Sequence, residues 1–329
     1  MDQLALMSRA NDLSKLGLGY TSPNPIVGCI VVDSNNNVIA EEFHNGGPHA
    51  ESKAINSIKL MPSDATLFTT LEPCNHKGKT EPCSDLIIKS GIKNVVYSVA
   101  DPNPVAQGGS KKLSESGINV TSGVLTEKVE FTNRYWLKKI KTNRPYFTWK
   151  IAMTLDGKIA ALDGSSKWIT CVESREEVSK LRSQADAVLI GTGTAIADDP
   201  SLNSHDIGSR QPLRIVMGKR EIPATHKLND KSSATYFVKS HNASDLLELL
   251  KNLEVNQVLV ESGPILATAL MKHGLIDEIV AYIAPSILGS GSSFIGDLNI
   301  STLSERLDYQ IHNVAQIGND LRVTLIGRR

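Results

Sequence analysis

Apolar positions in the first part of the chain alternate between helical and strand spacing. Apolar residues on one helical face, from Leu4 to Leu13, predict an amphipathic helix over residues 2–17. Two apolar runs on either side of an Asn-rich turn predict a hairpin. The strands expected here are 26–32, 38–42, 65–71, 94–100 and 117–124, with helices starting at Pro48 and Pro82. This alternation predicts a three-layer α/β unit with functional groups at the strand ends.

The pattern starts again after a charged stretch, Lys138 to Pro145, which predicts a solvated connector. The expected elements that follow are a helix over 173–184, a helix after Pro264, and strands over 146–152, 187–190, 213–217, 235–238, 257–260, 278–283, 309–316 and 321–326. The last strands follow one another without a helix, which indicates antiparallel pairing at one edge of a sheet. We therefore predict two α/β domains, residues 1–143 and 144–329.

Composition and charge narrow the class of protein. A chain of 329 residues with 40% hydrophobic and 21% charged residues is typical of a soluble protein of two domains. The formal net charge of zero argues against a general nucleic-acid-binding protein, which needs a basic surface. No segment reaches the about 18 apolar residues of a membrane span. The chain has four cysteines, of which two are expected to bind a metal and two have no obvious disulfide partner. Such cysteines favour a reducing compartment, so we expect a cytoplasmic protein.

The most specific chemistry lies in two short motifs, Pro48-His-Ala-Glu51 and Glu72-Pro-Cys74 with a later Cys83. One imidazole and two thiolates suit a tetrahedral zinc ion that keeps one position open for water. Zinc brings the pKa of such a water towards neutrality, and Glu51 can take its proton and return it to a leaving group. His-x-Glu followed by Pro-Cys and a second Cys is typical of zinc-dependent nucleobase deaminases.

This motif has one irregular feature and two alternative interpretations. Eight residues, 75–82, separate the cysteines, whereas nucleobase deaminases usually have two, so we interpret the polar, basic insertion as a substrate-binding extension. A structural zinc site would need a fourth ligand, and no further Cys or His lies close by in the sequence. A non-catalytic zinc scaffold would have no use for Glu51, although a Glu in a first helical turn also complements the helix dipole.

Several other polar residues are candidates with ordinary alternatives. Asn24 lies between two prolines that hold it extended, either to present its side chain or as part of a plain rigid loop. His44 could be a ligand, a substrate contact or an ordinary loop histidine. Lys150 lies in an apolar strand, where a buried lysine needs a partner or a chemical role.

Two glycine turns that follow strands, 191–194 and 261–264, suggest phosphate binding and a nucleotide cofactor. Neither has the spacing Gly-x-Gly-x-x-Gly, so a standard dinucleotide fingerprint is absent.

The order of motifs along the chain resembles the bifunctional deaminase–reductase family of bacterial riboflavin biosynthesis. The matching pieces are Pro23-Asn-Pro-Ile-Val-Gly-Cys29, Pro48-His-Ala-Glu51, Thr70-Leu-Glu-Pro-Cys74 with Cys83, Asp101-Pro-Asn-Pro104, Leu155-Asp-Gly157, Trp168-Ile-Thr170, Ala197-Asp-Asp-Pro200 and Glu261-x-Gly-Pro264. They span nearly the whole chain. The long insertion between the two cysteines is itself a feature of that family.

The resemblance implies two reactions and two folds. A cytidine-deaminase-like domain would deaminate 2,5-diamino-6-ribosylamino-4(3H)-pyrimidinone 5′-phosphate with Zn²⁺. A domain similar in fold to dihydrofolate reductase would then reduce the ribosyl to the ribityl chain with NADPH. The expected partner is this small phosphorylated pyrimidine rather than a nucleic acid or a membrane, and we expect a homo-oligomer.

The resemblance also assigns roles to individual residues. His49, Cys74 and Cys83 would bind zinc, with Glu51 as proton shuttle, and Asn24, His44, His76 and Lys79 would line the pyrimidine and phosphate pocket. Lys150, expected to be catalytic, and Ser166, Arg182, Leu202 and Glu261 match substrate positions of the reductase. Cofactor positions are Met153, Trp168, Thr194, Asp198 and the turn Gly263, Pro264, Ile265, Leu266, Ala267, Thr268 and Ala269.

One position departs from the family pattern. His205 stands three residues after Leu202, where the family often has an arginine. A histidine binds phosphate less firmly than an arginine does, so Arg210 or Arg214 is considered as a substitute.

A nucleic-acid deaminase with an unrelated second domain is the rival enzyme, and zero net charge and the two glycine turns argue against it.

Overall fold

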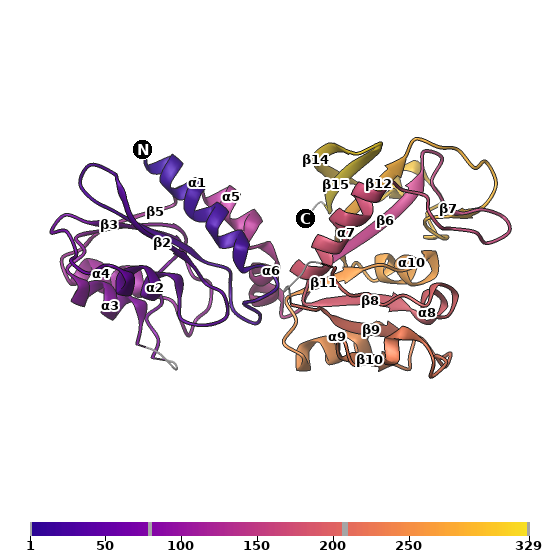
Figure 1. Cartoon of the computed structure of the whole chain (residues 1–329), viewed down its shortest axis with the longest axis horizontal. Coiled ribbons are helices and arrows are strands. Elements are labelled where there is room, and N and C mark those ends of the chain that lie inside the picture. The colour runs from indigo at the N-terminus through magenta and orange to yellow at the C-terminus, as the bar shows by residue number, and fades with distance from the viewer. Residues whose placement is uncertain (1, 78–80, 206–209, 328–329) are drawn as a thin grey trace. The chain divides into compact units, whose positions relative to one another are not determined.

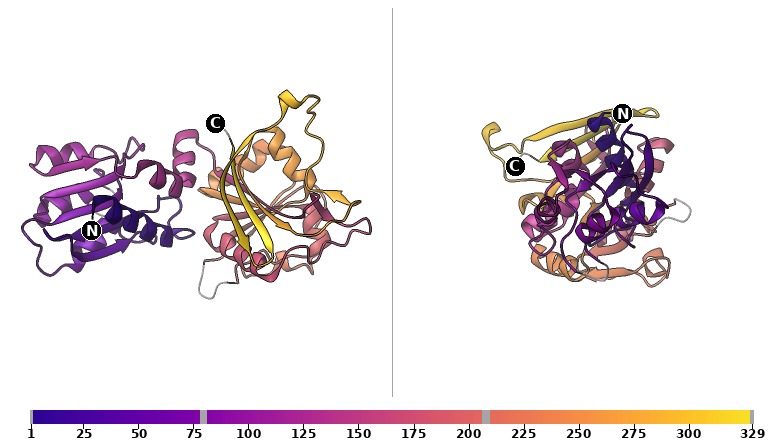
Figure 2. Two further views of the ribbon diagram at one scale, coloured as in Figure 1. Left: turned by 90° about the horizontal axis from the view of Figure 1, so that it is seen from above. Right: turned by 90° about the vertical axis from the view of Figure 1, so that its left-hand side faces the viewer.

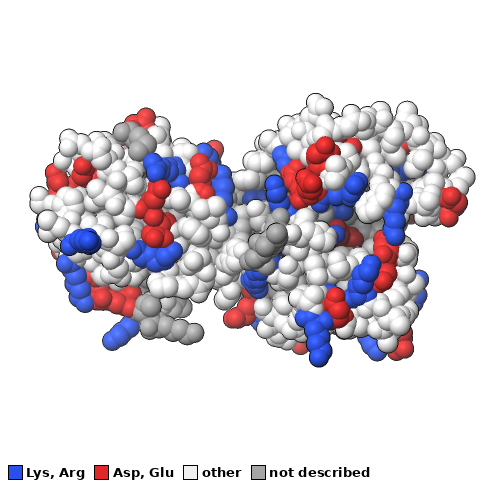
Figure 3. All heavy atoms as spheres, viewed as in Figure 1, with Lys and Arg blue, Asp and Glu red and all other residues white. Residues whose placement is uncertain are grey.

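The computed structural model describes residues 2–77, 81–205 and 210–327 of the chain. The chain divides into two compact units, Met1–Asn143 (first unit) and Arg144–Arg329 (second unit) (Figure 1). Among the described residues, no helix combines the length and apolar character that crossing a membrane requires. On the face drawn in Figure 3, acidic and basic side chains are interspersed and form no large basic surface among the described atoms.

The first unit is built on a five-stranded sheet in the order β2-β1-β3-β4-β5. Its elements are α1 (Gln3–Ser14), η1 (Lys15–Gly17), β1 (Gly28–Val32), β2 (Val38–Phe43), α2 (Ala50–Ser57), β3 (Thr66–Leu71), α3 (Cys83–Ser90), β4 (Asn94–Val99), α4 (Gly109–Glu115), β5 (Asn119–Ser122), α5 (Thr126–Thr132) and α6 (Arg134–Thr142). β1 pairs antiparallel with β2 and β3, whereas β3, β4 and β5 run parallel.

Both faces of this sheet are covered, which is why its central strands β1, β3 and β4 are buried along nearly their whole length. α1 covers one face, and α2, α3 and α4 cover the other (Figure 1). Leu6, Met7 and Ala10 of α1 pack on Ile30 and Phe68. Ala54 of α2, Ile87 of α3 and Leu113 of α4 belong to the core on the opposite face. The carboxyl ends of β3 and β4, in the interior of the sheet, thus lie between the helices that cover its two faces.

The stretch before the second unit differs from the solvated connector that its charges predict. Residues 138–142 are the last turns of α6, whose Trp136 and Leu137 are buried in the core of the first unit. Asn143 ends the helix in the left-handed conformation, at φ 55°. The prediction was wrong because Lys138, Lys139 and Lys141 lie on one face of a helix whose other face is apolar.

The second unit is built on an eight-stranded sheet in the order β10-β9-β8-β11-β6-β12-β15-β14. Its elements are β6 (Tyr146–Thr154), β7 (Lys158–Ala160), α7 (Val172–Gln184), β8 (Ala187–Gly191), α8 (Thr192–Asp198), β9 (Leu213–Met217), η2 (Lys227–Asn229), β10 (Thr235–Val238), α9 (Ala243–Asn252), β11 (Gln257–Val260), α10 (Pro264–Lys272), β12 (Ile276–Ala284), β13 (Ser292–Ser293), η3 (Leu303–Glu305), β14 (Tyr309–Ile317) and β15 (Asp320–Gly327).

Strand direction in this sheet divides it into two parts. β10, β9, β8, β11, β6 and β12 are joined by parallel ladders, and β12, β15 and β14 by antiparallel ones. The antiparallel edge expected from the consecutive terminal strands is therefore confirmed, and Figure 2 shows it as the long yellow hairpin. β6, which carries Lys150, lies in the interior of the sheet between β11 and β12.

Candidate active sites

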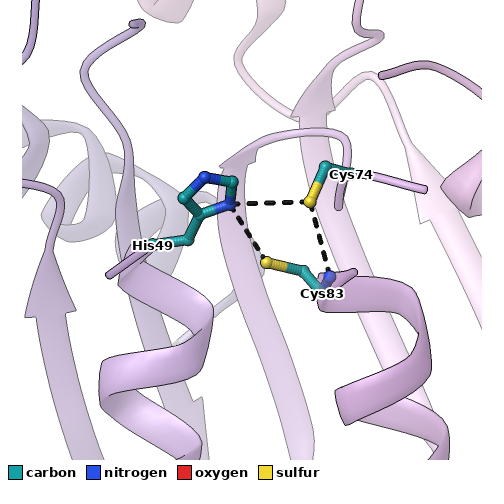
Figure 4. A group of neighbouring side chains, drawn as sticks. All are labelled: His49, Cys74 and Cys83. Atoms are coloured by element: carbon teal, nitrogen blue, oxygen red, sulfur yellow. Dashed lines mark hydrogen bonds between the residues drawn. The ribbon is translucent and has the colours of Figure 1, made fainter. Parts of the chain in front are cut away.

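The first site lies where β3 ends and two helices begin. His49 is the residue before α2, Cys83 is the first residue of α3, and Cys74 follows β3 in the intervening loop (Figure 4). His49 Nδ1 lies 3.3 Å from Cys83 Sγ and 3.5 Å from Cys74 Sγ. The Cys83 backbone N–H donates to Cys74 Sγ at 3.4 Å. Three ligand atoms from distant parts of the chain thus converge.

This donor set fits zinc in both chemistry and spacing. With Zn–S near 2.3 Å and Zn–N near 2.0 Å, a tetrahedral ion separates N from S by about 3.5 Å, close to the separations found here. The three ligand atoms all lie within 4.8 Å of one another, and this triad of His49, Cys74 and Cys83 is the group that the described residues offer to a metal. Three protein ligands leave a fourth position for water or substrate, as in catalytic zinc sites.

The charges around these ligands favour a cation. Hydrogen bonds from Cys83 and His49 lower the pKa of the Cys74 thiol to about 4, so it is a thiolate at neutral pH. The hydrogen bond to Cys74 raises the pKa of His49 to about 9. A metal ion competes with this proton, so binding would release it.

Glu51 lies in the first turn of α2, beside the ligands. Its side chain is 3% exposed, and burial raises its pKa to about 7. A carboxyl with this pKa can accept and donate a proton at neutral pH, as a general acid–base needs.

A residue that the sequence reasoning did not single out anchors the Cys74 loop. Buried Glu72 accepts the backbone N–H of Asp101 at 3.1 Å and that of Ser110 at 2.9 Å. It thereby ties the end of β3 to the loop after β4 and to the first turn of α4. A Cβ built on Gly109 would lie 1.7 Å from the Pro73 carbonyl oxygen, so α4 packs directly on the residue before Cys74. Glu72 is part of the Glu72-Pro-Cys74 motif, so the sequence did contain a signal for a role beside the metal ligands.

Gly109→Ala is expected to weaken zinc binding by at least tenfold, because the new methyl group must push the Pro73–Cys74 backbone away from His49 and Cys83. The measurement is zinc retention during titration with a chelator, followed by metal analysis. Gly47→Ala is the control, because its Cβ would meet only the Asn45 side chain, at 3.8 Å. Equal zinc retention by both variants would show that α4 does not set the ligand geometry.

The residues predicted to bind substrate in this unit differ in their burial and in their hydrogen-bond partners. His44 is 3% exposed, its Nδ1 lies 3.2 Å from the Pro48 carbonyl oxygen, and its ring meets that of His49 edge-on at 5.5 Å. His44 Nε2 and His76 Nδ1 are buried without a hydrogen-bond partner in the described structure. Asn24 is exposed in the loop before β1. Lys79 lies outside the described residues.

The second site is a cavity of about 990 Å³ in the second unit. Its lining includes predicted substrate residues and predicted cofactor residues, namely Lys150, Ser166, Trp168, Arg182, Thr194, Asp198, Leu202, Glu261, Gly263 and Pro264. These residues come from β6, α7, α8, the start of α10 and the loops that follow β7, α8 and β11. The carboxyl ends of parallel strands meet there, where ligands bind in open α/β sheets.

A buried ion-pair triad forms one wall of this cavity. Arg182 Nε donates to Glu261 Oε1 at 2.6 Å and Arg182 Nη2 donates to Glu261 Oε2 at 2.9 Å. Lys150 Nζ lies 3.3 Å from Glu261 Oε2. Burial alone would raise the pKa of Glu261, but the charges of Arg182 and Lys150 overcome it and lower the pKa to about 2. The partner that Lys150 needs in a central strand is therefore Glu261.

Comparison with known proteins decides the family. The profile described as RibD C-terminal domain matches residues 145–323, and that of the cytidine and deoxycytidylate deaminase zinc-binding region matches residues 1–99. Riboflavin biosynthesis protein RibD of Mycobacterium tuberculosis is 39% identical over 317 residues, which cover 94% of this chain and 93% of that protein. RibD of Escherichia coli is 34% identical and covers 98% of both chains.

The chain belongs to the RibD family.

A solved structure supports the same conclusion across both units. The diaminohydroxyphosphoribosylaminopyrimidine deaminase/5-amino-6-(5-phosphoribosylamino)uracil reductase of Thermotoga maritima matches with a TM-score of 0.91 and 34% identity, covering 99% of this chain and 98% of that one. The α/β class, the bifunctional deaminase–reductase activity, and zinc and NADPH as cofactors, all expected from the sequence, are thus confirmed for this member of the RibD family.

Some predicted cofactor residues lie away from the cavity lining. Ala267 is fully buried in the apolar core and Thr268 accepts the Gly296 N–H at 2.8 Å, so α10 presents mainly its first turn to the cavity. Ile265 is 87% exposed and Leu266 packs against the core. Met153 lies in β6 and also packs against the core. Their roles as cofactor contacts stay predictions.

Arg175 is a cavity residue that the sequence reasoning missed. Its guanidinium lies 4.4 Å from the centre of the Trp168 ring and donates to the Thr170 carbonyl oxygen at 2.6 Å. Trp168 is 72% exposed, so this cation–π contact holds an otherwise uncovered ring at the cavity. An arginine near the start of a polar helix carries no sequence signal for such a contact.

The suggestion that Arg214 replaces the missing arginine at position 205 is wrong. Arg214 is fully buried and donates to Asp230 Oδ1 at 2.9 Å and to the Asp230 carbonyl oxygen at 3.0 Å. It closes the loop after η2 instead of facing the cavity. Arg210 lies 3.7 Å from Asp186 Oδ1, while His205 lines the cavity.

Proposed function

We propose that the first unit deaminates 2,5-diamino-6-ribosylamino-4(3H)-pyrimidinone 5′-phosphate and that the second unit reduces the ribosyl group of the product to ribityl with NADPH. The assignment of one reaction to each unit rests on the two sites described above. The observation that carries it is the convergence of His49 with the buried Cys74 and Cys83, with the buried Glu51 beside them.

In the first unit, the chain's residues bind the metal, handle protons and position the substrate. Zinc, when bound by His49, Cys74 and Cys83, supplies Lewis acidity and a water of lowered pKa. Glu51 accepts a proton as a carboxylate and returns it as an acid to the departing ammonia, which its pKa of about 7 permits. The buried Nε2 of His44, which lacks a partner in the described structure, is free to bind a polar group of the pyrimidine.

In the second unit, the triad supplies positive charge next to a bound anion. Lys150 reaches the cavity from a central strand, and Glu261 orients it. Opening of the ribosyl ring leaves electrons on the ring oxygen, which must take up a proton as hydride reduces C1′. Lys150 is the proposed donor for that proton. Two hydrogen bonds to Glu261 hold the Arg182 guanidinium at the wall of the cavity. From this position Arg182 is proposed to bind the substrate phosphate without leaving the triad.

The test is to supply the diamino nucleotide with and without NADPH. Ammonia release without NADPH, followed by NADPH oxidation in a one-to-one ratio to ammonia when the cofactor is added, supports the proposal. Deamination of tRNA or single-stranded DNA in preference to the free nucleotide would instead identify a nucleic-acid deaminase.

Compartment and assembly belong to the same proposal. The free cysteines Cys29 and Cys171 and the two thiol ligands support a reducing compartment, and so the cytoplasm. A homo-oligomer is proposed as well, and light scattering of the purified protein would test it.

A further inference from the structure

A buried carboxylate in the C-terminal hairpin holds the start of α7. Asp320 is the first residue of β15 and is 3% exposed. Its Oδ2 accepts the Cys171 backbone N–H at 2.8 Å and the Ser174 hydroxyl at 2.6 Å. Cys171 is the residue before α7, and Ser174 lies in the first turn of that helix. The helix dipole also favours a negative charge at this end, so one side chain from a distant segment fixes where α7 begins.

The turn that precedes Asp320 packs on the same helix start. The Cys171 thiol donates to the Ile317 carbonyl oxygen at 3.3 Å. Gly318 has a φ of 56°, and a Cβ built on it would lie 2.6 Å from Glu173 Oε2 and 2.9 Å from Cys171 Sγ. A side chain at this position would therefore push the hairpin turn away from α7. The close approach and the two hydrogen bonds of Asp320 join the two segments at one point.

The segment held in this way is a wall of the cavity in the second unit. Trp168 and Thr170, which precede α7, and Arg175 near its start all line the cavity. Arg175 joins the three residues, because it stacks on the Trp168 ring and donates to the Thr170 carbonyl oxygen. Asp320 itself lies outside the cavity lining. Any effect of Asp320 on a bound ligand must therefore act through the position of the helix start.

The other end of α7 is held independently. Arg182 lies about two turns beyond Arg175 and is fixed by two hydrogen bonds to Glu261. Loss of the Asp320 carboxylate would thus release the wall formed by Trp168 and Arg175, while the buried ion-pair triad keeps its place.

We infer that Asp320 is a positioning residue of the reductase site, which sets the place of Trp168 and Arg175 through the start of α7. The inference rests on the proposed function, because it takes this cavity as the place where NADPH and the deaminated nucleotide bind. Because the triad is held separately, misplacement of the wall weakens binding more than it slows the chemical step. The inference therefore predicts higher KM values with a nearly unchanged kcat.

The test is steady-state NADPH oxidation by the full chain carrying Asp320→Ala. The KM values for NADPH and for the deaminated nucleotide are expected to rise about tenfold, and kcat to fall by less than about threefold. A protein that is merely destabilised would instead contain fewer active molecules, which lowers the apparent kcat and leaves both KM values unchanged. Deamination should stay at the wild-type rate.

Two further variants grade the effect. Asp320→Asn keeps an oxygen that can accept both hydrogen bonds, so its KM values should return to within about threefold of wild type. Ser174→Ala removes only one of the two bonds and should raise both KM values about threefold, which keeps the test available if Asp320→Ala does not fold.

Gln316→Ala is the matched control in the same hairpin turn. The Gln316 side chain is exposed and donates to the Gly318 carbonyl oxygen at 3.1 Å, so it bonds the turn itself rather than α7. This variant should keep both KM values at the wild-type level.

A fluorescence measurement follows the wall directly. Of the three tryptophans, Trp168 is exposed, whereas Trp136 and Trp149 are buried. Acrylamide therefore quenches mainly Trp168, whose ring is covered by the Arg175 guanidinium. Variants that lose a hydrogen bond to Asp320 should show a higher quenching constant for this exposed component, and the control should match wild type.

Three results would overturn the inference. They are unchanged KM values in a folded Asp320→Ala, a fall in kcat without a rise in either KM, and an equal rise in KM in Gln316→Ala. The second of these would leave Asp320 with a role in stability alone. Wild-type protein that oxidises no NADPH with the deaminated nucleotide would overturn the proposed reductase function itself, which is a separate result.

Discussion

Glu51→Gln is expected to lower the rate of deamination by about 10²–10⁴-fold, the range that a positioned proton-transfer group contributes. The amide has nearly the shape of the carboxylate, but it neither accepts nor donates the transferred proton. Because Glu51 is not one of the three converging ligands, the variant should retain its zinc. Ammonia release and metal content, measured on the same preparation, test both parts of this expectation.

The control for this variant is Glu41→Gln, since Glu41 lies on β2 in an exposed ion pair with Arg9. It should deaminate at the wild-type rate. Glu51→Gln should reduce the deaminated nucleotide at the wild-type rate, because the cavity of the second unit is lined by none of the residues of the zinc site. Wild-type deamination by Glu51→Gln would end the proposed proton-shuttle role.

Lys150→Ala is expected to lower NADPH oxidation with the deaminated nucleotide by about 10²–10⁴-fold, since the variant loses the proposed proton donor of the cavity. Deamination should remain at the wild-type rate. The fold should survive, because Glu261 keeps both hydrogen bonds from Arg182 after Lys150 is lost. Separate assays of ammonia release and NADPH oxidation distinguish these effects.

Lys150→Arg is the informative companion to this variant, because it keeps the positive charge beside Glu261 and loses a readily transferred proton. A role in proton donation predicts that Lys150→Arg remains impaired in turnover while it binds the substrate well. Full activity of Lys150→Arg would assign Lys150 to electrostatic positioning instead. Loss of both activities in a folded Lys150→Ala would contradict the assignment of one reaction to each unit.

The sequence was most informative where chemistry restricts residue type and spacing together. His49, Cys74 and Cys83 are few, soft-to-borderline ligands, so their convergence could be predicted even across the unusual insertion between the cysteines. Lys150 was also informative, because a lysine in a central apolar strand is stable only with a partner. The identity of that partner, Glu261, depends on β6 and β11 being neighbours in the sheet, which local patterns do not specify.

What the sequence left open depends on packing between distant segments. The basic residues of α6 suggested a connector, because their charge is visible locally whereas the burial of Trp136 is not. Arg214 was a candidate for phosphate binding because its charge is visible locally, yet it is enclosed by Asp230 and by loop carbonyl oxygens. Only the tertiary fold distinguishes a structural arginine from one that is available to a phosphate.

The most direct test of the two-site account is NADPH oxidation by metal-depleted protein supplied with each of the two nucleotides in turn. The account predicts oxidation with the deaminated nucleotide, none with the diamino nucleotide, and recovery of the latter when zinc is restored. Two results would contradict the account. One is NADPH oxidation with the diamino nucleotide in the absence of metal, and the other is a folded protein that needs zinc to oxidise NADPH with either nucleotide.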